Sequence, residues 1–123
     1  MQLKVRDRLK VLFVSESATD FFRWLGQLQL AGFDMQAVQI ETELALREAL
    51  ANEAWDVIIC DFLLSSLDSF AVLRLIRQTS SEIPFIFISD PVGEETAVAA
   101  LKAGANDFVM RNHLSRLPVV VQR

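Results

Sequence analysis

The chain has 123 residues, a hydrophobic fraction of 52% and few glycines and prolines. This length and composition are typical of one globular domain and argue against a disordered or repetitive chain. The net charge of −4 argues against a general nucleic-acid surface, and a single cysteine, Cys60, excludes an internal disulfide and a multi-cysteine metal site.

The two ends of the chain and its apolar stretches indicate a cytoplasmic protein without a membrane partner. No apolar stretch approaches the ~18 residues of a membrane-spanning helix. The apolar residues after the basic N-terminus are interrupted by Ser15, Glu16 and Asp20, unlike those of a signal peptide. We expect residues 1–9 to form a solvated tail and residues 10–123 to form the domain.

Short apolar runs alternate with segments that carry apolar residues at helical spacing. Ser, Thr and Asp residues supply candidate helix N-caps, and glycines supply candidate stops. In chain order, the predicted elements are a strand at 10–15, a helix at about 18–31, a strand at 33–40, a helix from Thr42 to near Asn52, a strand at 56–60, a helix from Asp68 through Arg77, a strand at 85–88, a helix between Gly93 and Gly104, a strand at 107–110, and the start of a helix within 112–123.

Five strand–helix pairs with short connections predict an α/β fold. Each parallel crossover needs a covering helix, so we expect a five-stranded parallel sheet with helices on both faces. The doubly wound, flavodoxin-like strand order 2-1-3-4-5 fits five such pairs. The fifth helix has so little length that we expect it to be truncated, in a domain cut from a longer polypeptide or a stand-alone module with a short tail.

Four of the predicted strands end in residues that can carry chemistry. Glu16 follows the first strand, Asp61 the third, Ser89 the fourth and Arg111 the fifth. The carboxyl ends of parallel strands lie side by side, and ligands bind there. The sequence therefore predicts that two acids, a hydroxyl and a cation meet in one crevice.

The order and spacing of these residues resemble the receiver domain of bacterial two-component response regulators. Residues 61–70 resemble the phosphoacceptor loop of that family, and residues 93–107 resemble its fourth helix and the turn into its fifth strand. The resemblance covers residues from about 10 to 122. It implies a signalling domain that accepts a phosphoryl group on Asp61 in a phosphorelay and then switches a protein-interaction surface. Beyond self-catalysed phosphorylation and dephosphorylation, it implies no enzyme.

The resemblance also implies a role for each site residue. Asp61 is the phosphoacceptor nucleophile, Ser89 hydrogen-bonds the phosphoryl group, and Arg111 pairs with that group. Ser89 and Phe108 correspond to the family's switch residues, with Phe108 in place of the common Tyr. Asp90 stands where the family has a small residue, so its carboxylate is expected to oppose an incoming phosphoryl donor.

The resemblance implies an Mg²⁺ ion held by Glu16, Asp61 and the backbone carbonyl of Leu63, with Ser15 as a further candidate ligand. Mg²⁺ prefers oxygen ligands, often carboxylates. The family usually has two acids where this chain has Ser15 and Glu16, so we expect weak binding. Arg111 replaces a near-invariant Lys. Because arginine pairs bidentately with carboxylates, it can clamp Asp61 or Glu16 in the resting state and partly replace the metal.

The implied partners are a sensor histidine kinase or phosphotransfer protein, and an effector domain on the same or another chain. The resemblance implies no direct contact with nucleic acid, and it implies homodimer formation through the face of the fourth helix, fifth strand and fifth helix.

Two alternatives stay open at this point. A degenerate receiver would act as a phosphate-independent interaction module. Ser15, Asp90 and Arg111 favour this alternative, whereas Asp61 and Ser89 argue against it. The other alternative is a flavin- or nucleotide-binding protein on the same fold. The chain lacks a Gly-rich phosphate loop after the first strand, and Glu16 stands there instead, which argues against that function.

Overall fold

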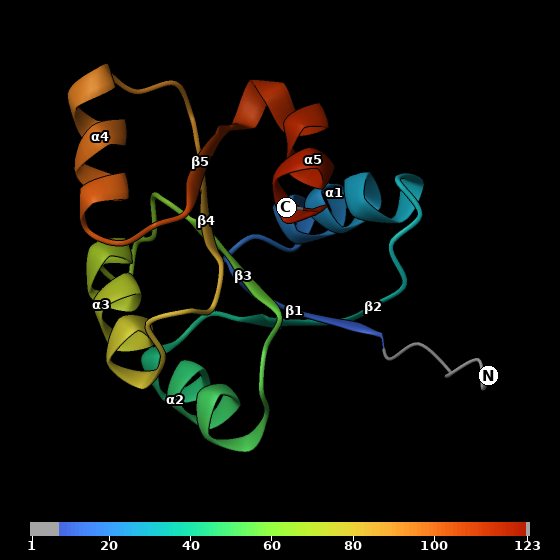
Figure 1. Cartoon of the computed structure of the whole chain (residues 1–123), viewed down its shortest axis with the longest axis horizontal. Helices are drawn as coiled ribbons and strands as arrows, with labels where there is room; N and C mark the ends of the chain where they lie inside the picture. The colour runs from blue at the N-terminus through green and yellow to red at the C-terminus, as the bar shows by residue number, and fades with distance from the viewer. Residues whose placement is uncertain (1–7, 123) are drawn as a thin grey trace.

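The computed structural model describes residues 8–122 and contains one parallel sheet (Figure 1). Its strand order is β2-β1-β3-β4-β5, which confirms the predicted doubly wound α/β fold. The strands are β1 (Leu9–Val14), β2 (Met35–Ile40), β3 (Val57–Asp61), β4 (Phe85–Ser89) and β5 (Asp107–Met110). Residues 1–7 of the predicted N-terminal tail lie outside the described residues.

Helices alternate with the strands along the whole described chain. They are α1 (Ala18–Leu30), α2 (Glu43–Asn52), α3 (Ser69–Thr79), α4 (Glu94–Lys102) and α5 (Leu117–Gln122), with the 3-10 helix η1 (Arg111–Arg116) before α5. The side chains of Ser17, Thr42 and Asp68 accept hydrogen bonds from backbone N–H groups at the starts of α1, α2 and α3. These contacts satisfy donors that a helix leaves free at its N-terminus, which explains where the three helices begin.

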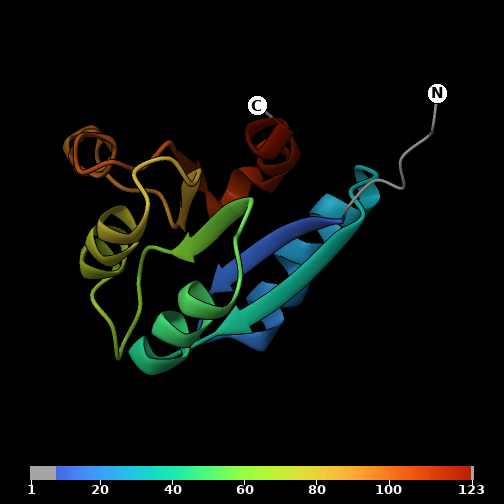
Figure 2. The same ribbon diagram turned by 60° about the horizontal axis from the view of Figure 1, so that its bottom comes forward.

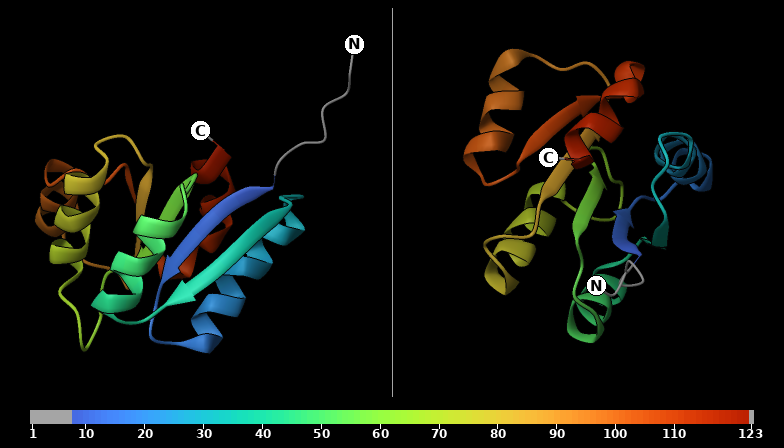
Figure 3. Two further views of the ribbon diagram at one scale, coloured as in Figure 1. Left: turned by 90° about the horizontal axis from the view of Figure 1, so that it is seen from below. Right: turned by 45° about the vertical axis from the view of Figure 1, so that its right-hand side comes forward.

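The sheet separates two hydrophobic layers (Figures 2 and 3). α2, α3 and α4 cover one face, where Cys60, Leu73 and Phe87 are buried, and α1 and α5 cover the other face, where Phe13, Trp24 and Leu117 are buried. All five residues of β3 and all five of β4 are buried. Continuous apolar runs therefore became central strands because both of their faces are covered.

The start of β2 and the segment after β5 differ from the prediction. β2 begins at Met35 instead of residue 33, after a turn that ends at Gly32 with φ +95°. Between residues 111 and 117 the chain first forms η1, in which His113 departs from helical geometry, and only then α5. Pro118 lies in the first turn of α5, where its missing N–H is not needed for a helical hydrogen bond. Within residues 8–122, no helix combines the length and the apolar character needed to cross a membrane.

Candidate functional site

Arg111 brings three carboxylates together at the carboxyl edge of the sheet. It follows β5, and each of its three guanidinium nitrogens donates to a different acid. Nη2 lies 3.0 Å from Oδ1 of Asp61 at the end of β3, and Nη1 lies 2.8 Å from Oδ2 of Asp20 in the first turn of α1. Nε lies 3.0 Å from Oδ1 of Asp90, which follows β4. We call these four residues the Arg111 cluster.

Asp61 is the most deeply buried acid of the Arg111 cluster, with 7% of its surface exposed. Its Oδ1 accepts hydrogen bonds from Arg111 and from the backbone N–H of Leu63, at 3.0 and 3.2 Å. Its Oδ2 accepts no hydrogen bond from any residue that the structure describes. Burial raises the pKa of Asp61 above its ordinary value, although the positive charge of Arg111 acts in the opposite direction. Asp61 is thus held through one oxygen and has its other oxygen open.

The guanidinium of Arg111 lies over the aromatic ring of Trp24 in a cation–π contact. Its central carbon lies 5.7 Å from the ring centroid of Trp24, which has no exposed surface. The indole N–H of Trp24 has no hydrogen-bond partner among the described residues. Although burial alone would lower the pKa of Arg111, the carboxylates of Asp61, Asp20 and Asp90 raise it. Arg111 is therefore a fixed positive charge.

Glu16 does not join the Arg111 cluster, in contrast to the convergence that the sequence predicts. Its Oε1 accepts hydrogen bonds from the backbone N–H and the hydroxyl of Ser65, and its Oε2 accepts the same two from Ser66, all within 2.8 to 3.0 Å. The backbone hydrogen bonds of Ser65 and Ser66 are the main cause that lowers the pKa of Glu16 to about 2. Glu16 therefore anchors the loop between β3 and α3.

Two further residues singled out from the sequence, Ser15 and Ser89, have hydroxyl groups that are hydrogen-bonded locally. Ser15 is buried, and its Oγ donates to the carbonyl of Ser17 and accepts from the N–H of Ser17. Ser89 is also buried, and its hydroxyl donates to the carbonyl of Asp90 at 2.8 Å. Among the described residues, Asp61 accepts no hydrogen bond from either serine. Ser15 thus stabilises a turn, and Ser89 stands one residue from the carboxylate that contacts Arg111.

Phe108 is part of the core rather than of the surface. It is 7% exposed and packs edge-on against Phe62, with ring centroids 5.2 Å apart, and its centroid lies 6.0 Å from that of Phe87. Such aromatic contacts are favourable beyond the area that they bury. The aromatic residue predicted as part of a switch is thus already turned inward in this structure.

Asp20 is the site residue that the sequence interpretation missed. An acid in the first turn of a helix has an ordinary explanation, because it faces the positive end of the helix dipole. The signal that could have identified it is its spacing from Trp24. Residues four apart lie on the same side of a helix, so a buried Trp24 indicates that Asp20 also faces the sheet.

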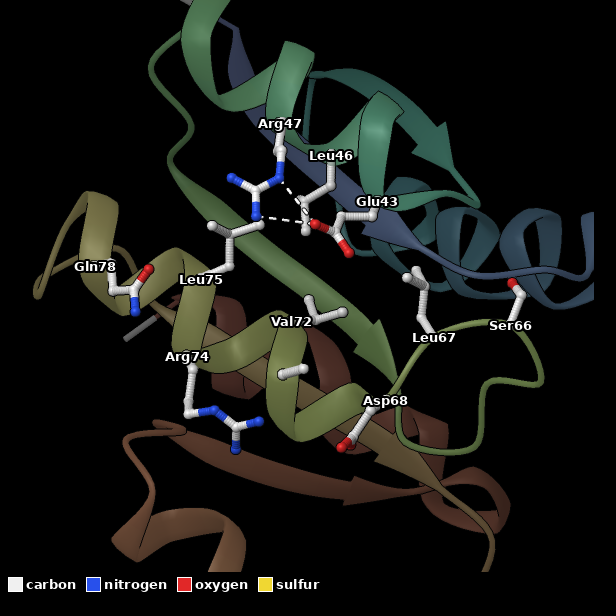
Figure 4. Close-up of a pocket in the computed structure, with 11 residues that line it drawn as sticks. Glu43, Leu46, Arg47, Ser66, Leu67, Asp68, Val72, Arg74, Leu75 and Gln78 are labelled. Atoms are coloured by element: carbon white, nitrogen blue, oxygen red, sulfur yellow. Dashed lines mark hydrogen bonds and ion pairs between the residues drawn. The ribbon is translucent and has the colours of Figure 1, made fainter.

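A groove lies away from the Arg111 cluster, between α2 and α3 (Figure 4). This groove of about 380 Å³ is lined by residues that include Leu46, Val72 and Leu75, with the Glu43–Arg47 ion pair on one side (Figure 4). Ser66, which Glu16 binds, lies at its edge. No member of the Arg111 cluster lines the groove, so the candidate site is the cluster and not the groove.

Comparison with known proteins assigns a family to this arrangement. The family model described as the response regulator receiver domain matches residues 13–121. The DNA-binding transcriptional regulator NtrC of Escherichia coli (strain K12) is 30% identical over 87 residues, which are 71% of this chain and 19% of NtrC. The chain thus spans about a fifth of the length of that curated relative.

Solved structures agree with the family model. The receiver protein from Pseudomonas putida superposes with a TM-score of 0.80 at 24% identity, covering 96% of this chain and 98% of that chain, which shows a shared fold. NtrX from Brucella abortus superposes with a TM-score of 0.83 at 26% identity, covering 95% of this chain and 27% of that chain.

Proposed function

The chain belongs to the response regulator receiver domain family, and from this premise we propose that Asp61 is its phosphoacceptor. In this proposal a phosphorelay delivers the phosphoryl group from a histidine kinase or a phosphotransfer protein. The modified domain then presents an altered surface to an effector. The observation that supports the proposal is the hydrogen bonding of the Asp61 carboxylate. Its Oδ1 accepts from Arg111 and from the N–H of Leu63, and its Oδ2 accepts from no described residue.

The chemistry needs little from the protein beyond position and charge. Oδ2 of Asp61 attacks phosphorus, a P–O bond forms, and the bond from phosphorus to the donor atom breaks with its electron pair leaving on the donor. Phosphoryl transfer is catalysed mainly by positioning and by neutralisation of charge. Arg111 supplies a positive charge 3.0 Å from Oδ1 of the nucleophile, and the N–H of Leu63 supplies a second donor to the same oxygen.

Receiver domains generally bind Mg²⁺ at the phosphorylation site. The residues of this chain do not fit that ion while Glu16 is bound by Ser65 and Ser66 and Asp61 is bound by Arg111. A carboxylate offers about four lone-pair positions, and Glu16 already accepts four hydrogen bonds. Within residues 8–122, no three His, Cys, Asp or Glu side chains are grouped closely enough to hold a metal ion. The weak Mg²⁺ site expected at Glu16, Asp61 and Leu63 would require Glu16 to give up its hydrogen bonds to Ser65 and Ser66, and no step of the proposed reaction depends on that site.

Family membership implies a histidine kinase partner and an effector domain. The relative NtrC is named a DNA-binding transcriptional regulator, and the matched region is 19% of its length. We therefore assign any effector function to a segment or protein other than this domain. In this proposal residues 8–122 contact proteins and not nucleic acid.

One observation favours the alternative of a phosphate-independent interaction module. Phe108 is already packed against Phe62 and Phe87, so its inward position does not require phosphorylation. If this alternative holds, Asp61→Asn leaves partner binding unchanged. If Asp61 is a working phosphoacceptor, the same variant loses the part of partner binding that depends on a phosphodonor.

The direct test of the acceptor role is to locate the modification. The protein is incubated with acetyl phosphate, digested at low pH and mapped by mass spectrometry. An added phosphoryl group on the peptide that contains Asp61 supports the proposal. An adduct that maps only to other residues overturns it.

A further inference from the structure

Arg111 is surrounded by carboxylates from three separate parts of the fold. Asp20 comes from α1, Asp61 from β3, and Asp90 from the segment that follows β4. Each acid contacts a different nitrogen, so the planar guanidinium lies between the three acids. Its side chain is 20% exposed, which makes these contacts less screened by water than a surface ion pair.

Asp20 and Trp24 are the groups that fix the guanidinium in place. The Asp20 contact at 2.8 Å is the shortest of the three, and the side chain of Asp20 is 21% exposed. The ring of Trp24, one turn further along α1, lies under the guanidinium with its centroid 5.7 Å away. Asp90 contributes less, because its side chain is 62% exposed and ion pairs with exposed partners are weak.

We propose that Arg111 is the built-in cation of this site, positioned by Asp20 and Trp24 where a divalent ion would otherwise neutralise Asp61, and that the site consequently does not bind Mg²⁺. The ion requires oxygen ligands gathered in a small octahedral shell. Here the oxygens of Asp20, Asp61 and Asp90 are spread around a planar group, and Glu16 has its lone pairs filled by Ser65 and Ser66. This inference deepens the proposed function. The role of Arg111 during phosphorylation rests on Asp61 being the phosphoacceptor, whereas the absence of Mg²⁺ binding concerns the unmodified protein and does not.

Removing the positive charge of Arg111 tests whether it keeps Mg²⁺ out of the cluster. Without the guanidinium, Asp20, Asp61 and Asp90 lose the cation that holds them apart, and three unpaired carboxylates can then close on a divalent cation. Arg111→Met keeps much of the length and apolar stem of the side chain and removes the charge. The matched control is Arg116→Met, because Arg116 is half-exposed and pairs only loosely with Asp107, at 3.4 Å.

The experiment is titration with MgCl₂ followed by isothermal calorimetry, on wild type and on both variants. The proposal predicts no saturable heat for wild type and for Arg116→Met in the millimolar range. It predicts saturable binding by Arg111→Met, at least about tenfold tighter than any binding by wild type. Saturable millimolar binding by wild type that Asp61→Asn abolishes overturns the proposal. So does a folded Arg111→Met variant that binds no better than wild type.

The positioning role of Asp20 can be tested by tryptophan fluorescence, because the emission spectrum of a folded variant reports the surroundings of the indole and not the stability of the fold. In a Trp55→Phe background, Trp24 is the sole tryptophan, and its emission reports the guanidinium above it. Asp20→Asn is expected to shift this emission, whereas Asp34→Asn, which alters a surface pair with Arg8, is expected to leave it unchanged. Identical emission spectra for folded Asp20→Asn and its parent overturn the positioning role.

Phosphorylation with acetyl phosphate in EDTA and in Mg²⁺ separates this inference from the proposed function. Equal adduct on Asp61 in both conditions supports the built-in cation. Adduct that forms only with Mg²⁺ overturns the inference and leaves the acceptor role intact. Failure to form adduct in either condition counts against the acceptor role, and the calorimetric titration of the unmodified protein then decides the inference by itself.

Discussion

Nη2 of Arg111 donates to Oδ1 of Asp61 at 3.0 Å, and Oδ2 of Asp61 accepts no hydrogen bond from any described residue. The pair joins the ends of β3 and β5, which are separated in the sheet by β4. Burial raises the pKa of Asp61 even with Arg111 beside it. In the folded protein, burial therefore makes the charged form of Asp61 less favourable than it is in the unfolded chain.

We expect Asp61→Asn to unfold at a higher temperature than wild type at pH 7. An acid whose pKa is raised on folding binds its proton more tightly in the folded state, so its contribution to stability falls as pH rises from the unfolded value of 3.8 through the folded value. The neutral amide removes this cost and can still accept from Leu63. Differential scanning calorimetry at several pH values checks the prediction, and the gap between the two proteins should narrow toward pH 3.8. A lower melting temperature for Asp61→Asn at pH 7 would show that the ion pair with Arg111 outweighs burial.

Glu16→Gln is expected to loosen the loop between β3 and α3. The side chain of Gln keeps one oxygen and turns an N–H₂ group toward donors of Ser65 or Ser66, so about half of the four acceptor contacts are lost. Hydrogen exchange should become faster at the N–H groups of Ser65 and Ser66 and stay unchanged in α5. Glu43→Gln, at the surface pair with Arg47, is the matched control.

The anchor at Glu16 should also respond to pH in a defined window. Because its pKa in the folded protein is lowered from 4.5 to about 2, its stabilising contribution is complete above pH 4.5 and is lost as pH falls through about 2. In wild type, protection of Ser65 and Ser66 should fall over that window, and Glu16→Gln should lack this pH dependence. Protection in wild type that is already lost near pH 4.5 would contradict the anchor.

Phe108→Ala is expected to lower the free energy of unfolding by about 3 kcal/mol, a value typical of a buried Phe replaced by Ala. Phe108 packs against Phe62 and Phe87, and the truncation leaves a cavity between their rings. Urea denaturation measures the change. Phe22→Ala is the control, because Phe22 is 65% exposed, and its effect should stay below about 1 kcal/mol. A loss as small as that of the control would show that Phe108 is free to leave the core.

The fold could be predicted because its signals are local. The apolar runs at 10–15, 56–60 and 85–88 mark central strands, and the N-caps Thr42 and Asp68 mark helix starts. Asp61 and Arg111 were likewise placed at the same edge of the sheet, because the carboxyl ends of parallel strands must meet there. Those features depend on periodicity and topology, which a single sequence contains.

The contacts of Asp20 and Glu16 could not be predicted from the sequence, because they depend on side-chain direction and on loop geometry. Asp20 contacts Arg111 across 91 positions of sequence, and an acid at the start of a helix needs no such partner to explain it. Glu16 stands at the predicted edge, but the loop at Ser65 and Ser66 offers four donors that turn it away from Asp61. The direction of a side chain between two competing sets of partners is decided by packing, which periodicity does not describe.

The most direct test of the phosphoacceptor claim is the intact mass of the protein after incubation with acetyl phosphate. Wild type, Asp61→Asn and the surface control Asp34→Asn are compared under the same conditions. We expect one added phosphoryl group in wild type and in Asp34→Asn, and none in Asp61→Asn. Equal phosphoryl incorporation by Asp61→Asn and wild type would contradict it.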